Sequence, residues 1–141
     1  HLFGVFGPFE DYQVRFISYA IIQSLLKMPI NINQNIEFDY LYIKDLTRII
    51  NEFIHRPANF HSYNVTTGMP ITLLEIVELI REVTGIPQEV NIRNPGLGAS
   101  YTGSNQRLLS FLGTDFRFTP IKESIEEFVL WHEKNLNRRP E

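Results

Sequence analysis

Hydrophobic and polar positions along the chain predict short strands separated by longer helices. Residues 2–6 form an apolar run closed by a Gly-Pro pair, which indicates a buried strand ending in a turn. From Phe16 apolar residues recur at helical spacing, and this pattern predicts a helix that stops before Pro29. Residues 30–32 can form a short extended piece, and residues 38–43 have the aromatic and branched composition of a strand.

Residue types that cap helices mark further helices. Asp45 directly follows the strand predicted before it, where its side chain would cap the next helix. Thr72 and Glu75 form a Thr-x-x-Glu capping box, and Gly85 stands where the helix that they open would end. Thr119 is expected to be the N-cap of the last helix, with a proline in its first turn.

The remaining stretches are shorter. We predict strands at 63–65 and 90–92, an aperiodic loop at 94–104, a short leucine-rich helix ending at Gly113, and a frayed polar tail at 135–141. Strands that alternate with helices indicate an α/β protein with parallel strands. Because these strands are too few for a complete doubly wound sheet, the pattern predicts part of one.

Composition excludes several classes of function. The net charge is −3 and the 13 Lys and Arg residues are scattered, so we expect no nucleic-acid partner. The chain has no cysteine and its four histidines lack ligand spacing, so we expect no disulfide, no cysteine nucleophile and no metal. No apolar run approaches the ~20 residues that cross a membrane, so we expect no membrane partner. A cytoplasmic protein is the expectation that remains.

Four segments in a fixed order carry a family resemblance. They are residues 2–8 (LFGVFGP), 39–46 (DYLYIKDL), 63–75 (YNVTTGMPITLLE) and 107–120 (RLLSFLGTDFRFTP). Together they resemble the extended short-chain dehydrogenases/reductases, the NAD-dependent epimerase/dehydratase family of nucleotide sugars. The family patterns that these segments match in part are R-x-F-N-V-Y-G-P, R-D-F-x-[HY]-V-x-D, Y-N-V-G-x-G and a [KR]-x-x-x-x-L-G-[WF]-x-P ending.

The resemblance implies an α/β fold that is the C-terminal portion of such an enzyme, with a few Rossmann-sheet strands and a small, mostly helical substrate domain. Residues 1–141 would be the substrate-binding region, and the N-terminal NAD-binding Rossmann half would be absent. That half carries the family's G-x-x-G-x-x-G cofactor loop and its Tyr-x-x-x-Lys acid/base pair. We expect neither motif in this chain, and therefore no catalytic residue. The Gly96-Leu97-Gly98 triplet lies in the late loop and opens no helix.

The resemblance also implies which residues face the ligand. The turn after the first strand would lie beside the sugar, and Arg15 could meet a phosphate. The plainer interpretation of the turn is that it only ends the strand, and the plainer interpretation of Arg15 is a solvated residue. Arg107 could also be helix surface. Tyr42 and Asp45 are most simply a core aromatic and a helix cap. The predicted substrate-binding residues are Gly7, Pro8, Glu10, Arg15, Arg93, Asn94, Tyr101 and Arg107, and the predicted cofactor-binding residues are Gly4 and Phe6.

Two positions depart from the family pattern. Phe38 stands where the family usually has an arginine that pairs with the diphosphate, and Gly4 stands where it usually has asparagine. Arginine can clamp a diphosphate with two parallel hydrogen bonds, which neither residue here can replace. Either the nucleotide is held by other groups, or the substrate is not a usual nucleoside diphosphate sugar.

The expected function is the substrate-binding part of an NAD(P)-dependent nucleotide-sugar epimerase or dehydratase, and the full-length protein is expected to be a homodimer. A nucleotide-linked 4-keto-sugar reductase of the same family is the first alternative. A non-catalytic NAD(P)-sensing or binding protein with the same fold is the second, and a self-standing α/β binding module is the third. The cofactor, NAD or NADP, would be bound mainly by the N-terminal half.

Overall fold

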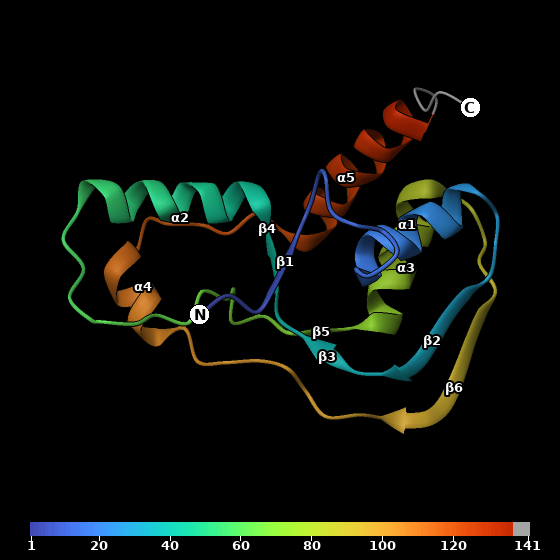
Figure 1. Cartoon of the computed structure of the whole chain (residues 1–141), viewed down its shortest axis with the longest axis horizontal. Coiled ribbons are helices and arrows are strands. Elements are labelled where there is room, and N and C mark those ends of the chain that lie inside the picture. Colours follow the sequence, from blue (N-terminus) through green and yellow to red (C-terminus); the bar gives the residue numbers. More distant parts are fainter. Residues whose placement is uncertain (137–141) are drawn as a thin grey trace.

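The computed structural model describes residues 1–136, in which helices flank a short pair of parallel strands (Figure 1). Strand β1 (Gly4–Phe6) pairs with β4 (Tyr40–Tyr42), with Gly4 opposite Tyr40 and Phe6 opposite Tyr42. The helices on one side are α1 (Phe16–Leu25), α3 (Leu73–Thr84) and α5 (Ile121–Leu136). The helices on the other side are α2 (Ile43–His55) and α4 (Gln106–Leu112).

Two more strand pairs extend the structure beyond β1 and β4. Strand β2 (Ile30–Asn35) pairs in parallel with β6 (Val90–Leu97), and β3 (Glu37–Phe38) pairs antiparallel with β5 (Ile71–Thr72). Isolated parallel bridges also join Leu2 to Val65 and Phe38 to Tyr101. The structure therefore has the predicted α/β class and shows parallel pairing where the strand-helix alternation indicated it.

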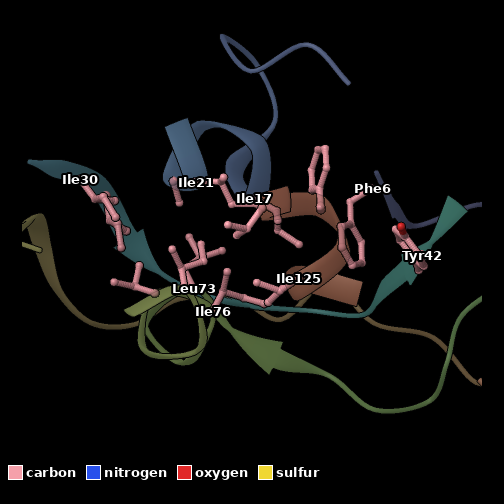
Figure 2. Packing of buried hydrophobic residues seen from close by; sticks show 14 residues of the cluster. Phe6, Ile17, Ile21, Ile30, Tyr42, Leu73, Ile76 and Ile125 are labelled. Carbon is pink, nitrogen blue, oxygen red and sulfur yellow. The ribbon is translucent and has the colours of Figure 1, made fainter. Parts of the chain in front are cut away.

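A larger and a smaller apolar core lie on the two sides of β1 and β4. In the larger core, side chains of α1 point toward those of α3 (Figure 2). Its labelled members are Phe6, Ile17, Ile21, Ile30, Tyr42, Leu73, Ile76 and Ile125. The smaller core contains Leu41, Ile49, Tyr63, Val65, Leu108, Phe111 and Leu112. Residues of β4 thus contribute to both cores, because successive strand side chains point to opposite faces. No helix within residues 1–136 is long and apolar enough to cross a membrane.

The predicted helix ends are confirmed where they depend on residues close together in the sequence. The Thr72 hydroxyl accepts a hydrogen bond from the Glu75 backbone N–H, and the Glu75 carboxylate accepts one from the Thr72 backbone N–H. Gly85 ends the same helix in the left-handed conformation, with φ of 67°. Helix α4 ends at Gly113 as predicted.

The predicted caps at Asp45 and Thr119 are wrong, and for one shared reason. Helix α2 already begins at Ile43, so the buried Asp45 lies inside its first turn. Helix α5 begins at Ile121, two residues after Thr119. The Asp45 carboxylate accepts hydrogen bonds from the Thr119 backbone N–H at 2.8 Å and from its hydroxyl at 2.9 Å. The two residues therefore bond to each other and tie α2 to the segment before α5.

The predicted strand boundaries also need correction. The expected strand 38–43 is interrupted at Asp39, whose buried carboxylate accepts a hydrogen bond from the Thr67 backbone N–H. Strand β6 continues to Leu97, so the first part of the expected loop 94–104 is strand paired with β2. The expected strand 63–65 is reduced to the Val65 bridge. Helix α5 includes residues 135–136, and the rest of the predicted frayed tail lies outside the described residues.

Candidate functional site

The candidate site is centred on Tyr40 of β4, which lies directly opposite Gly4 of β1. A Cβ atom at Gly4 would come within 3.1 Å of the Tyr40 ring and within 3.1 Å of the Asp39 carbonyl oxygen, so glycine leaves room for the ring. The Phe6 ring meets Tyr40 edge-on, with centroids 6.1 Å apart. Burial raises the pKa of Tyr40 well above its ordinary value, and the nearby Glu10 charge raises it further. Tyr40 therefore stays protonated and can donate a hydrogen bond.

Glu10 supplies the titratable group of the site. It follows a tight turn in which its backbone N–H donates to the Gly7 carbonyl at 3.2 Å and Phe9 adopts φ of 70°. Burial raises the pKa of Glu10 to about 7, against the opposing charge of Arg15. One buried Glu10 oxygen, Oε2, has no hydrogen-bond partner among the described residues. A buried polar atom normally has a partner, so this carboxyl group is a candidate to bind a ligand.

A cavity of about 250 Å³ adjoins Tyr40. Its walls are mainly aromatic and aliphatic, with hydroxyl groups from threonine and serine side chains among them. Such a lining suits a small organic group that is fixed by a few polar contacts. The lining residues are Phe6, Tyr40, Tyr42, Thr67, Met69, Ile71, Thr119, Pro120, Ile121 and Ser124.

Several predicted site residues lie together around Tyr40. Gly4 and Phe6 contact its ring, and Glu10 and Arg15 are close enough to shift its pKa. Tyr101 reaches the same group through Phe38, whose ring centroid lies 5.5 Å from those of both tyrosines. The cluster is therefore assembled from β1, the segment that follows it, β3, β4 and the loop after β6.

Gly7 and Pro8 take structural positions in that turn. A Cβ atom at Gly7 would lie 2.5 Å from the Ile43 side chain, and the Gly7 φ of 146° is one that other residues rarely adopt. Pro8 lines a different, mostly apolar cavity together with Tyr42, Glu127 and other residues. These two residues shape the turn that carries Glu10.

The other predicted residues lie elsewhere. Asn94 is in β6, where its amide donates to the Asn33 carbonyl and side-chain oxygens at 3.2 Å, and Arg93 is exposed beside it. Arg107 is in α4 with its guanidinium 5.1 Å from the centre of the Phe60 ring. It lines a separate polar cavity with Ser62, Asn64, Ser104 and Gln106. The structure thus divides the predicted residues among three places.

The centre of the site, Tyr40, was not among the predicted site residues. It lies in the second family segment, whose aromatic residues were interpreted as strand and core. The signal that could have found it is its register with Gly4, because a glycine opposite an aromatic residue marks a close approach. Register is not visible before the strands are paired.

The expectation that the chain has no Tyr-x-x-x-Lys pair needs correction, since Tyr40 and Lys44 have that spacing. The spacing brings two side chains together on a helix, but Tyr40 is in β4 and Lys44 is in the first turn of α2. The Lys44 ammonium pairs instead with Glu127, which also accepts a hydrogen bond from Tyr42 at 2.9 Å. Lys44 therefore does not act on Tyr40 as the lysine of an acid/base pair would.

The described residues do not fit a dinucleotide cofactor on their own. Phe6 is only 2% exposed and belongs to the larger core, and Gly4 is buried beside Tyr40. Gly96 and Gly98 lie at and just beyond the end of β6 and precede no helix that could cradle a pyrophosphate. A cofactor would therefore need binding groups beyond residues 1–136.

The fold is shared with part of the solved structures of nucleotide-sugar epimerases and dehydratases. The structure of UDP-glucose 4-epimerase from Thermotoga maritima, solved with UDP-glucose, matches 96% of this chain and 45% of its own length, with TM-score 0.80 and 19% identity. A dTDP-glucose 4,6-dehydratase from Bacillus anthracis, in complex with NAD, matches 96% of this chain and 44% of its own, with TM-score 0.80 and 20% identity.

Comparison of sequences finds relatives of the same kind as the structural neighbours. The UDP-glucose 4-epimerase of Halalkalibacterium halodurans is 26% identical over 102 residues, which are 69% of this chain and 30% of that protein. No protein-family model matches the sequence. The homologues of this chain are therefore nucleotide-sugar epimerases and related extended short-chain dehydrogenases/reductases. The chain spans less than half the length of these relatives.

Proposed function

We propose that this chain is the substrate-binding part of an NAD(P)-dependent nucleotide-sugar epimerase or dehydratase. The observation that carries the proposal is the convergence of Glu10, Arg15 and Gly4 on Tyr40, beside a cavity of about 250 Å³. Homology to enzymes of this class supports it. NAD(P), when bound, would supply the hydride acceptor, and residues outside this chain would hold it.

Each residue of the cluster has a proposed task. Glu10 would bond a sugar hydroxyl through its unpartnered oxygen, accepting a hydrogen bond when ionised and donating one when protonated. Tyr40 would donate its phenolic hydrogen, since its raised pKa keeps that hydrogen in place. Arg15 is exposed at the start of α1 and would face a phosphate. Arg93 and Asn94 on β6 would contact more distant parts of a long ligand.

Calorimetric titration of the full-length protein with UDP-, dTDP-, GDP- and ADP-linked sugars tests the proposal. We expect Glu10→Ala and Tyr40→Phe each to weaken binding of the best ligand by about tenfold, because each removes one polar contact. The exposed Glu123 provides the matched control Glu123→Ala, which should bind like the parent. Absence of binding to every nucleotide sugar would refute the proposal.

The alternatives differ in their products. An epimerase or dehydratase returns the cofactor to its starting oxidation state, whereas a 4-keto-sugar reductase consumes one NAD(P)H for each sugar reduced. A non-catalytic NAD(P)-binding protein would bind cofactor and yield no altered sugar. Following NAD(P)H absorbance and sugar products together, with full-length protein, separates these outcomes. Light scattering of the same sample tests the proposed homodimer, and cell fractionation tests the proposed cytoplasmic location.

A further inference from the structure

A polar cavity at α4 is not used by the proposed function. It has a volume of about 340 Å³ and lies where the chain segment after α2 passes the start of α4 (Figure 1). None of its lining residues lines the cavity beside Tyr40. We call it the arginine cavity, and its lining residues are Ser62, Asn64, Ser104, Gln106 and Arg107.

The Arg107 guanidinium is held beside the cavity by an aromatic ring. It lies 5.1 Å from the centre of the Phe60 ring, which packs edge-on against Tyr63 with ring centroids 5.8 Å apart. The Tyr63 hydroxyl accepts hydrogen bonds from the backbone N–H groups of Asn59 and Phe60 at 2.9 and 3.1 Å. The ring that supports Arg107 is therefore itself fixed, and a cation–π contact supplies the guanidinium with no oxygen acceptor.

Arg107 differs from Arg56 in its lack of an acidic partner. Arg56 also packs on an aromatic ring, with its guanidinium 4.8 Å from the centre of the Phe111 ring, but it forms a salt bridge with Glu52 at 2.7 Å. Within residues 1–136, Arg107 forms no salt bridge. Because an arginine presents five N–H donors in a planar fork, the donors of Arg107 are available to an anion that enters the cavity.

The two chain segments that form the cavity contain no acidic residue. Residues 53–74 and 90–114, which include all of the lining residues, have no Asp or Glu, although the whole chain has 16 and a net charge of −3. The side chains of Ser62, Ser104 and Gln106 make no hydrogen bond to other residues in the described part of the chain, so they can donate to a ligand. The lining thus combines Arg107 with neutral donors, which suits an anion.

We propose that the arginine cavity binds a phosphate group, either free phosphate or the phosphate of a small phosphorylated metabolite. Arg107 would bond two phosphate oxygens in parallel, and the Ser62 and Ser104 hydroxyls would bond the remaining oxygens. At about 340 Å³ the cavity is larger than the one beside Tyr40, at about 250 Å³, which leaves room for the group that carries the phosphate. Because the two cavities share no lining residue, this inference does not depend on the proposed function.

The test is calorimetric titration of the full-length protein with inorganic phosphate, with glycerol 3-phosphate and with glycerol. We expect both phosphates to bind with Kd on the order of 1 mM or below, more weakly at high salt, and glycerol not to bind. Tighter binding of glycerol 3-phosphate than of inorganic phosphate identifies a metabolite as the ligand, and the reverse identifies free phosphate. Absence of binding by both phosphates at roughly 10 mM would overturn the proposal.

Variants assign the binding to this cavity. Arg107→Gln should weaken phosphate binding by about tenfold or more, because it removes hydrogen bonds from a charged donor. The matched control Arg56→Gln changes an arginine that does not line the cavity and should bind phosphate like the parent. Equal phosphate affinity of Arg107→Gln and the parent would overturn the proposal, since phosphate would then bind elsewhere.

The same variant separates this site from the candidate sugar site. Arg107→Gln should bind nucleotide sugars like the parent, because Arg107 does not line the cavity beside Tyr40. Loss of nucleotide-sugar affinity in this variant would overturn the separation of the two sites. Phosphate binding by a protein that binds no nucleotide sugar would support this inference while the proposed function fails.

Discussion

Replacing Asp39 by alanine should destabilise the chain more than any exposed substitution. The Asp39 side chain is 1% exposed and accepts hydrogen bonds from the Thr67 N–H at 2.8 Å, the Thr67 hydroxyl at 2.7 Å and the Gly68 N–H at 2.8 Å. These bonds fasten the turn after residue 65 to the β3–β4 junction. Alanine would leave all three donors without this acceptor.

The expected magnitude follows from these bonds. Hydrogen bonds to a charged acceptor contribute about 1.5–3 kcal/mol each, and a donor that loses its partner recovers part of this by reaching water. Because Gly68 is exposed and Thr67 is half-buried, water can reach both. We therefore expect Asp39→Ala to lower the free energy of unfolding by about 3 kcal/mol, or Tm by roughly 10 °C. Asp39→Asn keeps one acceptor and should cost about half as much.

Urea denaturation followed by fluorescence can measure this loss, since Trp131 is the single tryptophan and packs against Phe128 of the larger core. Asp115→Ala removes an exposed carboxylate and should stay within about 0.5 kcal/mol of the parent. An Asp39→Ala variant as stable as the Asp115 control would refute the view that this carboxylate anchors the turn.

Three further changes test other parts of the structure. Thr72→Ala breaks the capping box and should lower the free energy of unfolding by about 1 kcal/mol in chemical denaturation. Hydrogen bonds from Thr72 lower the pKa of Glu75, so the stability that the Glu75 carboxylate contributes should disappear as pH falls through that lowered pKa. Burial raises the pKa of Glu10 to about 7, so the stability of the parent should decline as pH rises from 4.5 toward 7. In melting curves measured over a series of pH values, Glu10→Gln should lack this part of the decline. Gly7→Ala should lower Tm, because its Cβ would lie 2.5 Å from Ile43, and an unchanged Tm would contradict that packing.

Much of the fold could be predicted because its signals act over short distances along the chain. The capping box joins Thr72 to Glu75, three residues apart, and Gly85 ends the same helix through its own conformation. The apolar spacing from Phe16 likewise reports a helix face within ten residues. The α/β class followed from the alternation of these predicted elements. The resemblance to nucleotide-sugar enzymes followed from four segments that match family patterns in the correct order.

The wrong predictions concern polar side chains whose partners are distant. Asp45 and Thr119 each look like a helix cap in their own segment, but they lie 74 residues apart and bond to each other. Asp39 looked like part of a strand, and its partner Thr67 is 28 residues away. Local sequence can show that a carboxylate needs donors, but it cannot show which of several distant donors it will meet.

For the candidate site too, some information is local in the sequence and some arises only in the folded chain. By itself the sequence determined the α/β class and the resemblance to nucleotide-sugar enzymes, and it named Gly4, Glu10 and Tyr101 as candidate site residues. Only the tertiary structure decided that these residues meet around Tyr40 and that Arg107 lies elsewhere. The physical reason is that strand register creates the close approach at Gly4 and burial raises the pKa of Glu10, and both arise only when distant segments pack.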